Sequence, residues 1–421
     1  MPKLPTKNHE SNGQSNSVDS PDPKAGGRLA DHLAQRGSIL STENALPTLK
    51  DEPDLIKAIR LDIGRMGVVG ETENTLLIYL AGTSRLLRHP LRMIIRGKSS
   101  AGKSYPLMRV VSLFPPEEVV EATSLTPQAL YYGRSGWLRH KFLVKGERSQ
   151  RSDEEAADIT AALRQLISED RIVKQVTMRG EGEAGFETVT IIQEGPIAFC
   201  ETTTAKSIFA EDLNRCLQVW ADESHEQTRR IMKAAAEEYL LEFEAVDPEL
   251  VRARHREFQS SLERVEVKIP YAANLADAIS AEKLEARRAF KHVLAAVEAV
   301  TLLHQHHRSR DEHGRLIATP DDYTTARRLV MPSMNESLGH GERVWKAYAM
   351  RETFPKQFTS SDVMTAGAFG DKMTRDRALK DLVNLGILRC VNEGKGRRAA
   401  VWEWTGRELQ PALPEAVEAG E

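Results

Sequence analysis

The apolar residues divide the chain into a polar start, a long middle of alternating strand-like and helix-like patterns, and a smaller unit near the end. Residues 1 to about 45 are rich in Ser, Asn, Pro, Gly, Asp and Lys and contain few large apolar residues. Such a segment cannot bury enough surface to offset its chain entropy, so we predict a disordered tail at 1–45. The pattern of residues 46–90 is helical and stops at Pro90, which predicts an N-terminal helical segment.

Short apolar runs separated by amphipathic stretches follow in residues 91–223. Runs of this length predict buried strands, and the amphipathic stretches between them predict helices. Strands that alternate with helices are typical of an α/β fold, in which a parallel sheet carries helices on both faces. The predicted strands are 93–95, 140–145, 196–200 and 216–220, and the predicted helices are 104–113 and 156–168.

Two further β-rich runs interrupt this alternation. The runs at 172–178 and 188–192 flank the Gly- and Glu-rich segment 179–185. Such a pattern predicts a hairpin with a mobile tip, inserted at about 172–192.

The second half of the chain begins with helical patterns. They cover 224–245 and 275–305, and a polar connection is expected at 304–319. A smaller unit follows at about 355–405. We expect its first helix to be capped by Ser360 and Ser361, its second helix at 375–385, and a β-wing that runs through 402–404.

Composition and charge exclude several classes of protein. The 421 residues are 40% hydrophobic and 28% charged, which is typical of a globular protein with two or three domains. No apolar stretch approaches the roughly 18 residues of a membrane span, and no secretory signal begins the chain, so we expect a cytoplasmic protein. The three cysteines are far apart, as in a reduced compartment. A net charge of −3 excludes a basic coat but allows local basic surfaces for nucleic acid.

The clearest chemical motif is the pattern GxxxxGK[ST] between a predicted strand and a predicted helix. Glycines in such a loop let successive backbone N–H groups face one concavity, which holds phosphates at the N-terminus of the helix. The lysine should contact the β- and γ-phosphates of ATP, and the hydroxyl after it should bind Mg²⁺. The residues of this P-loop are Gly97, Lys98, Ser99, Ser100, Ala101, Gly102, Lys103 and Ser104.

A P-loop ATPase also needs an acid at the end of another strand to orient the attacking water. Glu147 follows the strand predicted at 140–145 and is the candidate for this base. An Asp-Glu pair is expected at such a strand end, but Gly146 precedes Glu147, so the acid on the metal side is missing there. The alternative is that Glu147 is an exposed loop residue. Asp153, Glu154 and Glu155 lie nearby, but they are better placed to cap the next helix.

Several segments in order resemble a known family. They resemble the AAA+ ATPase module of primase-helicase proteins of phages and mobile elements, over residues 50 to about 330. The resemblance implies an AAA+ core at 91–223, a helical lid and connector at 224–345, ATP and Mg²⁺ as cofactors, and assembly into a homo-oligomer, with a hexameric ring favoured. The segments are 96–104, 163–169, 195–198, 202–204 and 222–229.

The resemblance also implies roles for single residues. Thr202, Thr203 or Thr204 lies where AAA+ proteins keep a polar sensor of the γ-phosphate, and Thr203 is the candidate for this role. Arg215 lies where an arginine finger reaches the ATP of a neighbouring subunit, and a structural ion pair is its alternative. Arg229 is the candidate for a second sensor. Arg230 and the pair Arg287 and Arg288 stay open for that role, and each of these arginines could instead be solvated helix surface.

Two basic regions are candidates for contact with DNA. In MCM-like helicases a hairpin at this place enters the ring pore, which implies phosphate contacts by Lys174 and Arg179. The acidic residues Glu181 and Glu183 at the tip oppose that role, so a plain surface hairpin is the alternative.

The second basic region is 351–407, which is similar to a winged helix. Eleven Lys and Arg against seven Asp and Glu give it a net charge of +4. Such a unit reads the major groove with its second helix, and a protein-binding winged helix is the alternative. A tail is expected at 408–421. The candidate DNA contacts are Lys372, Arg375, Arg377 and Lys380 on the helix and Lys395, Arg397 and Arg398 on the wing.

Two functions follow from these features. The first is an ATP-driven ring, a DNA helicase of the replicative type from a phage or mobile element, which would work with a primase or another replication protein. The second is an ATP-gated DNA-binding regulator or loader that does not unwind DNA. A small-molecule kinase is less consistent with the chain, because it would not need an arginine finger, a pore hairpin and a winged helix.

Overall fold

The computed structural model describes most of the chain after the N-terminal 45 residues. The tail predicted at 1–45, the hairpin tip and the candidates Ser100, Arg179, Lys395, Arg397 and Arg398 lie outside the described residues. The described ranges are 46–99, 101–123, 125–147, 154–178, 186–205, 214–239, 246–281, 283–339, 341–366, 369, 371–394, 399–409 and 411–417.

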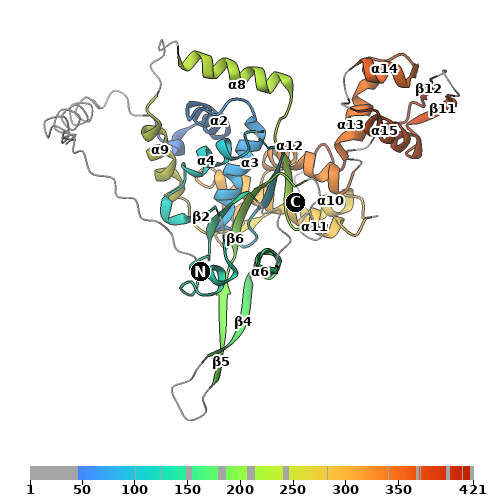
Figure 1. Cartoon of the computed structure of the whole chain (residues 1–421). Helices are drawn as coiled ribbons and strands as arrows, with labels where there is room; N and C mark the ends of the chain where they lie inside the picture. The colour runs from blue at the N-terminus through green and yellow to red at the C-terminus, as the bar shows by residue number, and fades with distance from the viewer. Residues whose placement is uncertain are drawn as a thin grey trace, which may run out of the picture. The chain divides into compact units, whose positions relative to one another are not determined.

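A five-stranded sheet in which every neighbouring pair is parallel forms the centre of the fold (Figure 1). The apolar runs predicted as strands lie in it, and one strand that the sequence pattern did not indicate joins at the edge. That strand, β2, is half exposed, so its few apolar residues gave no strand signal. In spatial order the strands are β2 (Val119–Ala122), β3 (Lys141–Glu147), β6 (Ile197–Thr203), β1 (Arg92–Arg96) and β7 (Leu217–Trp220).

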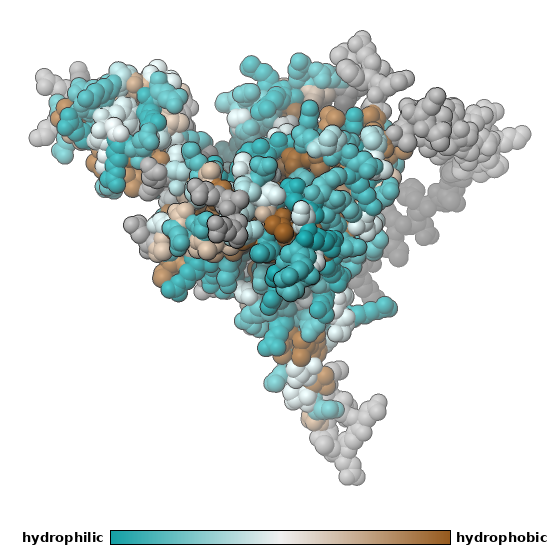
Figure 2. Space-filling view, turned by 180° about the vertical axis from the view of Figure 1, so that it is seen from behind, coloured by the Kyte–Doolittle hydropathy of each residue, from teal (hydrophilic) through white to brown (hydrophobic). Residues whose placement is uncertain are grey.

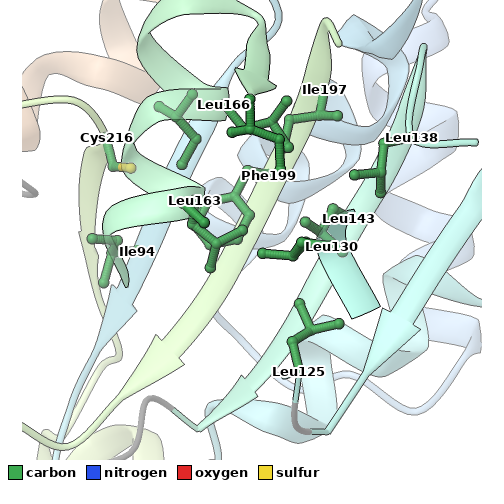
Figure 3. Close-up of a cluster of buried hydrophobic side chains, with 13 residues drawn as sticks. Ile94, Leu125, Leu130, Leu138, Leu143, Leu163, Leu166, Ile197, Phe199 and Cys216 are labelled. Atoms are coloured by element: carbon green, nitrogen blue, oxygen red, sulfur yellow. The ribbon is translucent and has the colours of Figure 1, made fainter. Parts of the chain in front are cut away.

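Helices cover both faces of this sheet, as the α/β pattern predicts. Successive residues of a strand point to opposite faces, and Ile197 and Phe199 of β6 point to the face covered by α6 (Glu154–Glu169). There they pack with Leu163 and Leu166 of α6 in a buried cluster, which Figure 3 shows between the helix and the strands. The short helix α5 (Pro127–Tyr131) adds Leu130 to the same cluster.

The opposite face is covered by helices that precede the P-loop in the sequence and by helices that follow it. The helix α3 (Thr72–Thr83) is buried from Thr75 to its end and contacts β6 and four other α-helices. A helix that is apolar all round must lie inside a core rather than at a surface. The helices of this layer are α2 (Leu55–Arg65), α3, α4 (Ser104–Val111), α9 (Pro248–Ser260), α11 (Ala286–Leu303) and α12 (Pro320–Ser337).

The runs predicted as a hairpin pair as two antiparallel strands, β4 (Arg171–Met178) and β5 (Glu187–Glu194). The base of the hairpin is held by Gln193, whose amide donates to the carbonyl oxygens of Tyr131 at 3.0 Å and Gly133 at 2.6 Å. Farther out, apolar side chains of both strands are exposed, and brown residues mark this region in Figure 2. Figure 1 shows the two strands extending away from the five-stranded sheet.

The prediction of one continuous helical stretch over 275–305 is wrong. Two helices, α10 (Ala272–Ala278) and α11, are separated at residues 279–285. The polar connection at 304–319 contains a strand, β9 (Leu316–Ile317), which pairs in parallel with β8 (Val267–Lys268). Strands of two residues are too short to give an apolar run. The remaining helix of this region is α8 (His225–Glu238).

The C-terminal unit builds its own apolar core, which includes Phe358, Leu379 and Leu388. Its sheet is antiparallel in the order β10-β12-β11, and the first of its two consecutive central helices is capped by Thr359 rather than by Ser360 and Ser361. Thr359 is the cap because its side chain and that of Asp362 bond each other's backbone N–H groups. The elements are α13 (Gly341–Ala349), β10 (Gln357–Thr359), α14 (Ser360–Thr365), α15 (Lys372–Asn384), β11 (Leu388–Asn392) and β12 (Val401–Trp404).

Part of the tail predicted at 408–421 packs against the rest of the chain. Leu413 is fully buried, and the Tyr323 hydroxyl donates to the Pro414 carbonyl at 2.7 Å. An apolar residue that packs against α12 therefore fixes these last described residues, although the surrounding sequence is polar and rich in proline. Among the described residues, no helix combines the length and the apolarity that crossing a membrane requires.

Candidate nucleotide site

The P-loop joins the end of β1 to the start of α4, which is the strand–loop–helix order that the motif requires. Each of its two glycines is required for a different physical reason. A Cβ at Gly97 would lie 3.1 Å from the Ala221 Cβ and 3.3 Å from the Lys103 side chain, so the loop packs too closely for a larger residue. Gly102 has a φ of +74°, a conformation that residues with a side chain rarely adopt.

Lys103 lies inside the loop rather than in solvent. Its side chain is 7% exposed, and its ammonium group donates to the carbonyl oxygens of Gly97 at 2.9 Å and Lys98 at 2.8 Å. A cation at the centre of a loop whose glycines free its backbone to bend is suited to bind phosphate oxygens.

The strand order brings Thr203 and Glu147 to the same end of the sheet as the P-loop. The strand β6 lies between β1 and β3, and the Gly97 N–H donates to the Thr203 carbonyl at 3.3 Å. One strand farther, the Glu147 carboxylate accepts from the Thr204 N–H at 2.5 Å. Ligands of open α/β sheets bind at the carboxyl ends of the strands, where these three groups lie.

Gly146 explains why the expected Asp-Glu pair is absent. A Cβ at Gly146 would lie 3.1 Å from the carbonyl oxygen of Thr123, which is backbone and cannot move aside easily. The pairing of β3 with β6 also shifts register between Lys145 and Glu147. An aspartate at this position would therefore crowd the neighbouring chain, and the shift turns Glu147 toward Thr204.

Ser104 is the residue expected to bind magnesium. It begins α4 directly after Lys103 and is exposed. In the described part of the chain no group of three or more His, Cys, Asp or Glu side chains could hold a metal ion. Magnesium often binds through one or two protein oxygens together with substrate phosphates, so a hydroxyl beside the lysine and a carboxylate at Glu147 fit this ion.

Glu223 is a charged residue of this site that sequence reasoning missed. It follows β7, which pairs with β1 on the side away from β6. Its carboxylate accepts from the Lys98 N–H at 2.6 Å and lies 3.0 Å from the Lys98 ammonium group. The available signal was an acid three residues after a predicted strand, but only the strand order shows that this strand lies beside the P-loop.

Arg215 lies at the other end of the sheet. It precedes β7, and its Nε donates to the Ser168 hydroxyl at 2.7 Å. It also lines a cavity of about 20 Å³ together with the buried pair Lys145 and Glu201, whose charged atoms are 3.5 Å apart. The structure therefore does not bring Arg215 to the P-loop of its own chain.

The candidates for a second sensor are exposed. Arg229 lies on α8 beside an open surface hollow, and Arg230 pairs with Asp222 at 3.7 Å. Arg287 and Arg288 are exposed near the start of α11. Within the described ranges, no hydrogen bond or ion pair joins Arg229 to the P-loop.

The candidate DNA contacts differ in what their side chains touch. Lys174 lies at the base of the hairpin, with its ammonium group 5.0 Å from the centre of the Tyr131 ring. Lys372, Arg377 and Lys380 are exposed on α15. Arg375 is 6% exposed and donates to the Ser360 carbonyl at 2.8 Å and to Asp376, so it holds α14 and α15 together. Its expected role in binding DNA is wrong, because its guanidinium faces the unit's interior.

Two comparisons with known proteins bear on this site. The sequence model of the MTBMA_p00010 P-loop domain matches residues 40–261, which include the P-loop, Glu147, Thr203, Arg215 and Glu223. The chain is also 25% identical over 295 residues to the uncharacterized protein MTBMA_p00010 of Methanothermobacter marburgensis. That alignment covers 67% of this chain and 35% of the relative, so the chain spans about a third of the relative's length.

Proposed function

The chain belongs to the MTBMA_p00010 P-loop domain family, and we propose that it hydrolyses ATP with Mg²⁺ to drive an action on DNA. Membership of a P-loop family implies that the chain binds a nucleotide. The finer proposal is an AAA+ motor that assembles into a ring and acts as a replicative-type DNA helicase. The observation that carries the hydrolysis step is the strand order, which aligns Lys103, Thr203 and Glu147 at one end of β1, β6 and β3.

Each of these residues has a distinct chemical task in the proposed reaction. The buried Lys103 ammonium binds phosphate oxygens and stabilises the charge that develops on them. Glu147 accepts a proton from, or orients, the attacking water, and its bond to the Thr204 N–H fixes the carboxylate at the strand end. Thr203 borders the loop and detects the phosphate nearest Glu147. Bound through Ser104 and the phosphates, Mg²⁺ would neutralise phosphate charge.

The position of Arg215 supports a reaction that needs a second subunit. An arginine that completes a nucleotide site across an interface must lie away from its own P-loop. Arg215 meets this condition, because it precedes β7 whereas the P-loop follows the opposite end of the neighbouring strand β1. This arrangement favours a homo-oligomer, and a hexameric ring is the form that the AAA+ resemblance suggests.

The C-terminal unit supports an action on DNA. Its order of elements is consistent with a winged helix, and α15 takes the place of the helix that enters the major groove. The exposed residues Lys372, Arg377 and Lys380 border a hollow of about 400 Å³ on this helix. Met373 and Asp376 also line this hollow, and its three exposed cations are the groups that would contact a phosphate backbone.

The test is ATP hydrolysis with and without DNA, followed by strand separation on a forked duplex. We expect phosphate release that DNA stimulates, and loss of both activities in Lys103→Ala. Hydrolysis and DNA binding without strand separation would favour the second candidate, an ATP-gated regulator or loader, which the exposed cations of α15 also fit. Absence of nucleotide binding would contradict the proposal altogether. Particle images with ATP and DNA would test the ring and any primase partner added to it.

The DNA surface has its own test in a variant with Lys372, Arg377 and Lys380 changed to glutamine. We expect weaker binding to duplex DNA and a flatter dependence on salt, by about 2 to 3 in the log–log slope. Hydrolysis without DNA is the internal control and should not change. An unchanged affinity at several salt concentrations would instead indicate that this unit binds protein.

A further inference from the structure

Glu223 reaches the P-loop because β7 and β1 end side by side. The Arg96 carbonyl accepts from the Ala221 N–H at 2.9 Å, so the chain leaving β7 stays next to the chain entering the loop. Two residues later, the Glu223 carboxylate accepts from the backbone N–H of Lys98 and lies against its ammonium group. A side-chain anion is therefore bound to the loop that phosphates are expected to occupy.

The charges around Glu223 are those that a nucleotide also needs. The backbone hydrogen bond from Lys98, followed by the charges of Lys98 and Lys103, lowers the pKa of Glu223, so the carboxylate is ionised at neutral pH. Backbone N–H groups and lysines of a P-loop bind phosphate oxygens in the same way. A triphosphate that enters this loop meets a negative charge already bound there.

Glu223 is also joined directly to the start of α8. Ser224 caps this helix by accepting from the Gln227 N–H at 3.1 Å, and Gln227 is buried and donates to the Val69 carbonyl at 2.7 Å. Beyond Gln227 the described side chains of α8 are exposed, apart from the half-buried Ala234. The buried anchor of the helix is therefore its first turn, next to the residue that contacts the loop, and Arg230 adds an exposed ion pair with Asp222.

We propose that Glu223 is a carboxylate ligand of the nucleotide-free P-loop, that it competes with the incoming triphosphate, and that its displacement moves helix α8. This inference rests on the proposed nucleotide site and adds a residue that sets its affinity. It also assigns α8 as the element that reports whether the loop is filled.

The first experiment compares the affinities of the purified full chain for ATP and ADP by titration calorimetry. Glu223→Gln keeps the shape and the acceptor oxygen but removes the charge. Glu226→Gln, in the exposed first turn of α8, is the matched control. We expect Glu223→Gln to bind ATP roughly three- to tenfold tighter, as a like charge about 4 Å away in a water-like dielectric predicts, with a smaller gain for ADP. The gain should shrink at high salt, and Glu226→Gln should match the wild type.

The outcomes separate this inference from the nucleotide proposal. If the wild type binds neither nucleotide, the proposed function fails. If the wild type binds ATP but Glu223→Gln binds it equally or more weakly, the competition proposed for Glu223 is wrong and the nucleotide site stands.

A second measurement tests the movement of α8. Met232 is 68% exposed on this helix, and Cys390 is the exposed cysteine, whereas Cys200 and Cys216 are buried. A fluorophore on Met232→Cys in a Cys390→Ser background should change its emission when ATP binds. With Glu223→Ala added, which removes the acceptor of the Lys98 N–H, the emission without nucleotide should already approach the ATP-bound value. Emission that stays at the wild-type nucleotide-free value in this variant would overturn the coupling.

Discussion

The two ends of the five-stranded sheet contain charged residues in different arrangements. At the carboxyl ends of the strands, Lys103, Glu147 and Glu223 contact backbone groups of the loops. At the amino ends, side chains of different elements bond each other: Arg92 and Asp170 at 2.8 Å, and Arg215 and Ser168 at 2.7 Å. Backbone N–H groups and lysines at the carboxyl ends can bind an anion, whereas side-chain pairs between elements hold the layers together.

This difference constrains where a catalytic arginine can act. Arg215 precedes β7, whose residues Leu217–Trp220 rise by roughly 10 Å toward the end that carries the P-loop. Its side chain bonds Ser168 before this strand begins. We therefore predict that any nucleotide that Arg215 stabilises belongs to another copy of the chain. The variants below test this division of the sheet.

The largest effect is expected from Lys103→Ala, which removes the cation at the centre of the loop. The Gly97 and Lys98 carbonyls lose their donor, and incoming phosphates lose their counter-charge. We expect phosphate release below detection. Thermal unfolding followed by circular dichroism is the control, and turnover at the wild-type rate would remove the P-loop from the site.

Arg215→Ala should have the next largest effect if this residue acts across an interface. An arginine finger changes the rate by about 10³ to 10⁵, whereas a surface ion pair is worth about 0 to 1 kcal/mol, or less than tenfold. We expect normal ATP binding and a turnover at least roughly 10³ lower. Mixing with Lys103→Ala chains should restore activity, because one interface then combines an intact loop with an intact arginine. More than a tenth of the wild-type activity, or no rescue, would assign Arg215 to structure.

Glu147→Gln tests the carboxyl ends of the strands and keeps the contact between residue 147 and the Thr204 N–H. Glutamine can still accept from the Thr204 N–H but cannot accept the proton from water. General-base catalysis is worth about 10² to 10⁴ in rate, so we expect ATP binding to persist while steady-state phosphate release falls by that factor. Equal turnover would move the base role to another acid.

The smallest effect is expected from Ser168→Ala. This change removes the hydroxyl that accepts from Arg215 and leaves the arginine itself in place. A finger that acts on another subunit keeps its charge, so turnover should fall less than about tenfold, and the melting temperature should drop by only a few degrees. A loss as large as that of Arg215→Ala would show that the two residues act as one structural pair.

Local sequence patterns were enough to predict the elements of the P-loop region but not their order. The apolar runs at 93–95, 196–200 and 216–220 lie within or next to strands of the sheet. Nothing in a local run specifies that β1 lies between β6 and β7, because that order depends on packing between residues more than a hundred positions apart. The motif itself was found because its physical requirements lie within eight consecutive residues.

The site residues beyond the motif show where local reasoning fails. Glu223 bonds a residue 125 positions away, so no local pattern indicates the contact. Gly146 interrupts the expected acidic pair because backbone from another strand lies against it. Arg375 belongs to a basic run, yet its face of α15 turns inward. In each case the outcome depends on a neighbour that the sequence does not place.

In the sheet, β1 lies between β6 and β7, which both come later in the sequence. This order sets when the site can form during synthesis. The ribosome completes the P-loop long before it completes β6 and β7, whose last residue, Trp220, follows Arg96 by 124 positions. At about 5 to 20 residues per second, the apolar strand waits roughly 6 to 25 s for its partners. During that interval the nascent chain exposes a hydrophobic strand with two unpaired edges, which is the kind of segment that chaperones shield.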